Sequence, residues 1–148
     1  MHPTQNQVDA ESGTRTDELS ATPADTLRVA ATYLEAHGWT RCQFFDFANQ
    51  LEPAACVVGA IRYAVYGYPE DSLRLDGPLG RHVELALWAV ADSLGVDVLA
   101  DLEPWLDCTA DAVQAWNDRP DRSAVEVIQA LREAADSYLG PRHIGGAA

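Results

Sequence analysis

The feature that most constrains the fold is an apolar run in the middle of the chain. Residues 54–66 read AACVVGAIRYAVY, and Arg62 is the only charged residue among them. A helix that is apolar almost all round belongs in the interior of a protein, whereas a surface helix has a polar face. Pro53 is suited to open such a helix because its fixed φ angle matches the first helical position. We therefore expect a central helix from about Pro53 to Tyr66, around which the other helices pack.

Four amphipathic helices are predicted around this central helix. Their apolar residues recur at helical spacing, and residues typical of helix ends bound them. Thr22 is suited to cap the first, and Ser123 with Glu126 three residues later makes a capping box for the last. One further brief helix is expected before Pro104, so the fold class is mainly all-α, with about five helices packed around a central apolar helix. The four amphipathic helices are predicted over about 23–37, 79–94, 110–119 and 124–139.

Residues 40–51 do not follow the helical pattern. Phe44, Phe45 and Phe47 favour an extended conformation, so we expect one short strand or hairpin there. The polar N-terminal residues lack periodicity, which is typical of a disordered leader. The predicted organisation is a disordered leader over 1–22, a single helical domain over 23–140 and a flexible tail over 141–148.

The charge balance disfavours several kinds of partner. Ten cationic side chains, all of them arginine, stand against 23 acidic ones, which gives a net charge of −13. So negative a surface repels phosphate, which argues against nucleic-acid binding through a basic patch and against attachment to an anionic membrane. The N-terminal residues 1–22 contain no apolar run of the length of an export signal, and no apolar stretch of the chain is long enough for a membrane span. We expect a cytoplasmic protein with three reduced cysteines, and the lack of lysine with abundant alanine indicates an actinobacterial host.

Cys56 is the candidate nucleophile. It is expected in the first turn of the central helix, where the helix dipole lowers the pKa of a thiol. A nucleophilic cysteine also needs a base, for which the sequence offers His37 and His82. The alternative, which we favour, is that Cys56 is a small buried residue on a packing ridge. No pair of histidines or cysteines has the spacing of a metal site, and no cofactor motif is present, so neither a metal nor a cofactor is expected.

Trp116, Asn117 and Asp118 form the candidate polar site. Trp116 is expected in the core, while Asn117 and Asp118 end their helix, where a carboxylate is unfavourable unless it has a partner. Because a buried arginine also needs a partner, we expect an ion pair between Asp118 and Arg62. We favour a structural role for these three residues over ligand binding.

Four segments together resemble a protein family. They are Gly38–Trp39, Cys56–Ile61 (CVVGAI), Trp116–Asp118 (WND) and Ser123–Leu131 (SAVEVIQAL). In this order they are similar to a family of uncharacterised small proteins from actinobacteria and their phages, over about residues 24–138. The resemblance implies no activity, substrate or site. The phenylalanine-rich segment before Pro53 departs from the family pattern, in which a more polar, glycine-containing hairpin is expected.

The leading functional prediction is a small acidic module that binds another protein or itself. It depends on the lack of a catalytic motif and on aromatic residues available for contact, namely Trp39, Trp88, Trp105 and the cluster Phe44–Phe47. The alternative is a small cysteine-dependent enzyme, or a pocket-forming accessory protein, that uses the cysteine and one of the two histidines named above. A weaker alternative is an acidic mimic of nucleic acid, which requires carboxylates aligned on one face.

Overall fold

The computed structural model describes residues 21–47, 51–72, 76–95 and 109–138. Within these ranges the chain forms five helices and one antiparallel pair of strands, which confirms the prediction of a mainly all-α fold with a short hairpin. The predicted tail over 141–148, the brief helix before Pro104 and nearly all of the predicted leader lie outside the described residues. The helices are α2 (Pro23–His37), α3 (Val57–Tyr66), α4 (Gly77–Leu94), α6 (Thr109–Asn117) and α7 (Ala124–Ser137), and the strands are β1 (Phe45–Asp46) and β2 (Ala54–Ala55).

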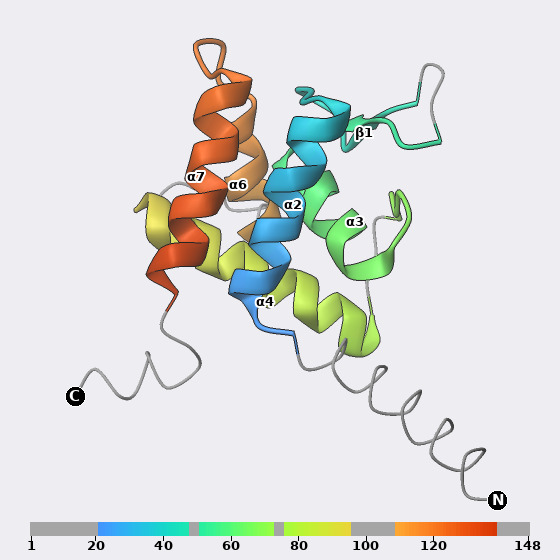
Figure 1. The fold of residues 1–148 in the computed structure, drawn as a ribbon, viewed down its shortest axis with the longest axis vertical. Coiled ribbons are helices and arrows are strands. Elements are labelled where there is room, and N and C mark those ends of the chain that lie inside the picture. The colour runs from blue at the N-terminus through green and yellow to red at the C-terminus, as the bar shows by residue number, and fades with distance from the viewer. Residues whose placement is uncertain (1–20, 48–50, 73–75, 96–108, 139–148) are drawn as a thin grey trace, which may run out of the picture.

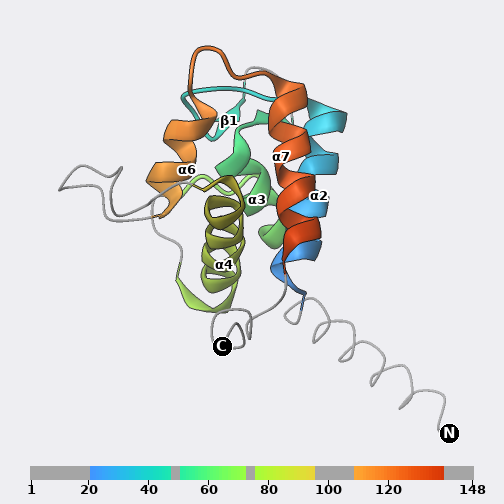
Figure 2. The ribbon, with the colours of Figure 1, turned by 90° about the vertical axis from the view of Figure 1, so that its left-hand side faces the viewer.

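α2 packs against three of the other described helices. It lies between α7 on one side and α3 on the other, and α4 crosses beneath α2 and α7 in the view of Figure 1. Figure 2 shows α2 and α7 side by side, with α6 next to α4. Arg28 contacts Asp136 and Glu35 contacts Arg132, so α2 and α7 run antiparallel. Exposed ion pairs contribute little to stability, and the pair is held mainly by buried apolar residues, among them Leu27, Leu34, Val127 and Leu131.

The starts of α2 and α7 agree with the sequence prediction. The Thr22 hydroxyl accepts a hydrogen bond from Asp25 N, and Thr22 N donates to the Asp25 carboxylate. Ser123 and Glu126 make the same reciprocal pair at the start of α7. These capping boxes satisfy two backbone N–H groups at each helix start. At its other end α7 stops at Ser137, slightly before the predicted end.

α3 begins later than the sequence predicts. The expected start is Pro53, whereas the helix begins at Val57 with Cys56 as its N-cap. The strand β2 occupies the intervening position, where Ala55 pairs with Phe45 of β1. Backbone groups that are hydrogen-bonded to another segment cannot also enter a helix, so α3 starts after them. The backbone groups of Ala55 and Cys56 are bonded to the segment that follows α2, at Gly38 O, Thr40 N and Phe44 O.

Only the first half of α3 lies at the centre of the core. Val57 and Ile61 are fully buried, while the residues from Tyr63 to Tyr66 are half-buried. The second half of α3 packs against the core without being fully enclosed by it. A Cβ atom at Gly59 would lie 2.2 Å from Phe44 O, so only glycine allows the segment before β1 to approach the helix this closely.

Candidate functional site

Asn117 is a completely buried polar side chain at the end of α6. Its Oδ1 accepts hydrogen bonds from Trp39 Nε1 at 2.8 Å and from Val57 N at 3.0 Å. Its Nδ2 donates to Thr40 O at 3.2 Å and to Asp118 Oδ1 at 2.9 Å. Two accepted and two donated bonds are all that a side-chain amide commonly makes. Asn117 thus joins α6 to the segment after α2 and to the start of α3.

Asp118 and Gln114 extend this arrangement. Asp118 Oδ1 also accepts from Cys42 N at 2.8 Å and from Gln114 Nε2 at 2.9 Å. Cys42 has a φ of +66°, which is uncommon for a residue other than glycine, and the bond to Asp118 holds its backbone in place. Gln114 Oε1 accepts from Cys56 Sγ at 3.1 Å. We call this group the Asn117 network; its members are Trp39, Thr40, Cys42, Cys56, Val57, Gln114, Asn117 and Asp118.

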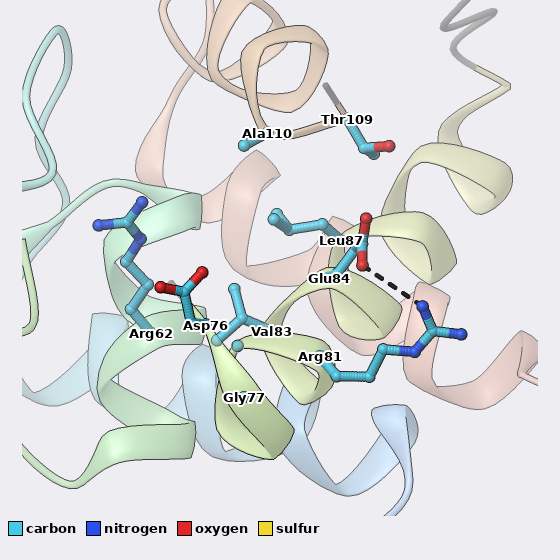
Figure 3. Close-up of a pocket in the computed structure, with 10 residues that line it drawn as sticks. Arg62, Asp76, Gly77, Arg81, Val83, Glu84, Leu87, Thr109 and Ala110 are labelled. Atoms are coloured by element: carbon cyan, nitrogen blue, oxygen red, sulfur yellow. Dashed lines mark ion pairs between the residues drawn. The ribbon is translucent and has the colours of Figure 1, made fainter. Parts of the chain in front are cut away.

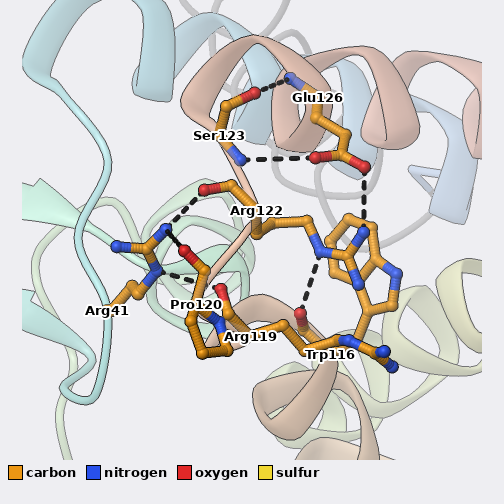
Figure 4. A network of polar contacts seen from close by, with 7 residues as sticks. All are labelled: Arg41, Trp116, Arg119, Pro120, Arg122, Ser123 and Glu126. Carbon is orange, nitrogen blue, oxygen red and sulfur yellow. Dashed lines mark hydrogen bonds and ion pairs between the residues drawn. The ribbon is translucent and has the colours of Figure 1, made fainter.

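Two arginines hold the connection between α6 and α7. The guanidinium of Arg122 lies 4.0 Å from the centre of the Trp116 ring, and it contacts the Glu126 carboxylate at 2.9 Å. Arg122 Nε also donates to Trp116 O at 3.1 Å. Trp116 is therefore half-buried beneath an arginine, rather than in the core as the sequence predicts. Arg41 reaches the same connection from the segment after α2, and Figure 4 shows it donating to three carbonyl oxygens, those of Arg119, Pro120 and Arg122.

The predicted ion pair between Asp118 and Arg62 is wrong. Arg62 is only 5% exposed, and it has no ion pair with a carboxylate of the described residues. Its NH1 atom donates to Glu70 O and Ser72 O, and its guanidinium lies 4.2 Å from the centre of the Phe44 ring. Arg62 Nε is buried without a hydrogen-bond partner. Burial lowers the pKa of Arg62, because a charged group loses hydration in the interior.

A surface pocket of about 380 Å³ lies beside Arg62, between the first three turns of α4 and the start of α6. Figure 3 shows Arg62 and Asp76 along one wall, with the side chains of Val83 and Leu87 at the base. Arg81 and Glu84 form an ion pair at 3.6 Å on the opposite side. The pocket carries as many carboxylates as guanidinium groups, so its charges favour neither an anion nor a cation. The remaining lining residues are Gly77, Gly80, Thr109 and Ala110.

Cys56 does not have the environment of a nucleophile. Its thiol is fully buried, and burial raises the pKa to about 11, opposite in direction to the sequence prediction. As the N-cap residue its sulfur accepts from Gly59 N at 3.3 Å, which lowers the pKa, but burial is the larger effect. His37 instead lies 3.6 Å from Glu52 and packs against Tyr33. Neither His37 nor His82, a half-buried residue on α4, is among the hydrogen-bond partners of the thiol.

The described fold coincides closely with the extent of a family match. A sequence model of a family of unknown function, DUF6197, matches residues 19–137, from just before α2 to the last residue of α7. The chain belongs to this family. For DUF6197 no activity follows from membership, and the predicted origin in actinobacteria and their phages stays a prediction. Neither the curated proteins nor the solved structures give a match to this DUF6197 protein.

Two kinds of site are absent from the part of this DUF6197 protein that the structure describes. None of its helices there is both long and apolar enough to cross a bilayer. Within the same residues, no three side chains among histidine, cysteine, aspartate and glutamate are grouped so that they can hold a metal ion.

The sequence did not indicate the partners of Trp116, Asn117 and Asp118. Trp39 was expected at the surface, but it is half-buried and donates to Asn117. Gln114 and Arg41 carried no signal beyond a polar side chain, although Gln114 stands four residues before Asp118 on one helix face. Of the other predicted surface aromatics, Phe47 is 49% exposed and Phe45 is buried; Trp105 lies outside the described residues.

Proposed function

We propose that this DUF6197 protein is a non-enzymatic module that binds another protein through the exposed face of α4. The observation that carries the proposal is a pair of exposed apolar side chains, Trp88 at 51% and Leu85 at 39%. They are three positions apart, so they are neighbours on the helix surface. The opposite face of α4 packs into the core through Val83, Ala86, Leu87 and Val90. The exposed pair is therefore not needed to hold α4 in the fold.

The chemistry of this face suits a protein contact. Tryptophan is among the residues that contribute most when they become buried at an interface, because the ring is large and rigid. Arg81 and Glu84 lie on the next turn towards the N-terminus of α4, where their ion pair supplies a polar rim. We call Trp88 and Leu85 the Trp88–Leu85 face. It has the apolar centre, and with Arg81 and Glu84 the polar edge, of a small contact surface.

Two considerations favour binding over catalysis and another protein over a second copy. A thiol with a pKa of about 11 is almost entirely protonated at neutral pH, which supports a packing role for Cys56. A net charge of −13 makes two copies repel one another, whereas it attracts a partner of opposite charge. The catalytic roles predicted for the cysteine with His37 or His82 stay predictions without support from these contacts.

The test uses photo-cross-linking of the full chain in its host. A photoreactive phenylalanine analogue at position 88 should give a cross-linked product with one other protein, whereas the same analogue at Val125, an exposed apolar residue on α7, should not. With the purified partner, Trp88→Ala should weaken binding by about 30-fold, the scale of an interface hot spot, and Val125→Ala should have little effect.

Three outcomes would contradict the proposal. The first is equal cross-linking from positions 88 and 125, and the second is partner binding that Trp88→Ala leaves unchanged. The third is a product that contains only two copies of the chain, together with a dimer mass in light scattering, which would establish self-association instead. The nucleic-acid mimic stays a prediction. It differs from the proposed contact in that the affinity for the partner would depend on carboxylates rather than on Trp88.

A further inference from the structure

A row of tyrosines lies at the edge of the molecule formed by α3 and the loop that follows it. Tyr63 and Tyr66 are three positions apart on α3, so they share one helix face. The Tyr33 ring on α2 lies 4.3 Å from the Tyr63 ring, and the Tyr66 ring lies 5.9 Å from that of Tyr68. Tyr68 is 52% exposed. In Figure 1 this edge lies on the far side of α2 from α7.

Carboxylates accompany these rings. Glu52 accepts a hydrogen bond from the Tyr63 hydroxyl at 3.0 Å, and Glu70 interacts with the Tyr68 hydroxyl. Asp76 lies close enough to Tyr66 to influence its hydroxyl. We define the tyrosine–carboxylate strip as six residues: Tyr63, Tyr66, Tyr68, Glu52, Glu70 and Asp76.

Burial and nearby carboxylates raise the pKa of the three tyrosines in the strip. Burial is the largest cause of a raised pKa at Tyr63 and Tyr66, with Glu52 and Glu70 as the next causes. At Tyr68 the largest cause is the hydrogen bond with Glu70. The last turn of α3 contains no basic residue, so the negative end of its helix dipole adds to the carboxylates.

The described cations near the strip offset only part of this charge. Arg62 is buried, its NH1 is bonded to the carbonyl oxygens of Glu70 and Ser72, and its positive charge acts on Tyr66 and Glu70. It is one positive charge against the three carboxylates of the strip. His37 lies beside Glu52 at 3.6 Å. Asp71, which is exposed, adds a further carboxylate next to the strip. Among the described residues, the outward-facing charge of this edge is therefore acidic.

We propose that the tyrosine–carboxylate strip binds a basic, arginine-containing segment of a partner protein. The carboxylates supply charge complementarity, and the tyrosine faces accept the planar guanidinium by cation–π contact. A net charge of −13 steers such a segment towards the protein and repels both a second copy of the chain and nucleic acid. The strip shares no residue with the Trp88–Leu85 face, although its Asp76 lines the same pocket as Arg81 and Glu84 at the rim of that face. The inference therefore goes beyond the proposed function and can fail without it.

The test is a titration of the full-length protein with a synthetic arginine-rich peptide, with lysine and glutamate versions of the same peptide for comparison. Backbone amide NMR shifts should concentrate at residues 63–72 and around Glu52 and Asp76, and the arginine peptide should bind more tightly than the lysine peptide. The double variant Glu70→Gln with Asp76→Asn should lower the affinity about 10-fold or more. Both substitutions keep the side-chain shape, and Asp76 makes no capping hydrogen bond to α4, so the fold should be retained.

A matched control separates the strip from general attraction to an acidic protein. The double variant Asp121→Asn with Glu133→Gln makes the same charge change elsewhere, at one residue just before α7 and one within it. It should change the affinity less than about 2-fold. Tyr68→Ala should weaken the arginine peptide more than the lysine peptide, because the cation–π contact favours a planar guanidinium. Equal losses in the two double variants, shifts spread over the whole surface, or no saturable binding would each overturn the assignment. Cross-linking from position 88 is unaffected by any of these results.

Discussion

Asn117, which bonds to the start of α3, and Arg62, which belongs to α3, are both buried polar side chains, yet the fold satisfies them differently. Each hydrogen-bonding atom of the Asn117 amide has partners, and three of the partners are a tryptophan N–H, a backbone N–H and a backbone carbonyl. Arg62 donates hydrogen bonds to two carbonyl oxygens and lies over the Phe44 ring, while its Nε has no hydrogen-bond partner. A neutral amide can be matched atom by atom with backbone groups. A guanidinium also carries a charge, and neutral partners compensate only part of the free energy that this charge loses when it is removed from water.

This contrast predicts unequal effects of removing the two side chains. Loss of Asn117 would leave buried donors and acceptors on other residues unpaired, which is more costly than loss of the bonds themselves. Loss of the Arg62 charge would relieve the desolvation of that charge while leaving two carbonyl oxygens that lie near the surface.

The largest expected effect is that of Asn117→Ala. The substitution leaves Trp39 Nε1, Val57 N and Thr40 O without their partner, so the free energy of unfolding should fall by about 3 kcal/mol or more. Denaturant titration followed by circular dichroism measures the change. Gln129→Ala is the control, because the Gln129 amide on α7 is exposed and donates to Glu133, and it should cost less than about 0.5 kcal/mol. A loss below about 1 kcal/mol for Asn117→Ala would contradict the role given to the network.

A smaller effect is expected for Arg62→Met. Methionine keeps the apolar contact with Phe44 and removes the charge, so stability should change by about 1 kcal/mol or less. Arg62→Ala should cost more, about 2–3 kcal/mol, because it also leaves a cavity. The same denaturant titration applies. If methionine costs as much as Asn117→Ala, then the two sites do not differ in the way described.

Double-mutant cycles with Asp118→Ala test individual pairs of residues, and the coupling energies expected are smaller than the effects above. Because Asp118 bonds to Asn117 and Cys42 and not to Arg62, the effects of Asp118→Ala and Arg62→Met should add to within about 0.5 kcal/mol. Asp118→Ala and Asn117→Ala should instead show a coupling energy of about 1 kcal/mol, since they share one network. Strong coupling with Arg62 would restore the ion pair that the structure excludes.

The smallest effect at neutral pH concerns the Cys56 thiol. Its pKa of about 11 lies above the ordinary value of 9.0, so the neutral thiol stabilises the fold below about pH 9 and this contribution is lost as the pH rises towards 11. Burial also raises the pKa of Tyr33, to about 12, so the neutral phenol likewise stabilises the fold and its contribution is lost as the pH rises. Cys56→Ala should reduce the loss of stability between pH 8 and about pH 10.5, measured by denaturant titration at each pH. In the native protein, Cys42 should react with a thiol reagent and Cys56 should not.

The elements that the sequence predicted correctly depend on local signals. The capping boxes at Thr22 and Ser123 involve residues three apart, and the periodicity of α2 and α7 is continuous, so their starts agree with prediction. The start of α3 depends on backbone bonds between Cys56 and Phe44 and between Ala55 and Gly38, and nothing in residues 53–57 indicates them.

The site was predictable only in part, for a similar reason. The WND residues stood out as polar groups at a helix end, and a structural role was favoured for them. The predicted pairing failed because a sequence shows which side chains are charged, whereas the partners of Arg62 are carbonyl oxygens and the face of Phe44. Three of the four residues bonded to Asn117 lie 60 to 78 positions earlier in the chain, beyond the reach of any local pattern.

The Asn117 bonds also bear on the order in which the chain can fold. Because they connect residues so far apart, they close large loops, and the entropy lost on closure delays such contacts until much of the chain is in place. During synthesis the N-terminus of α3 and the indole of Trp39 emerge well before the amide that satisfies them. A nascent chain that stops short of α6 should therefore remain open to proteases, and release of residue 117 from the ribosome should mark the onset of native protection.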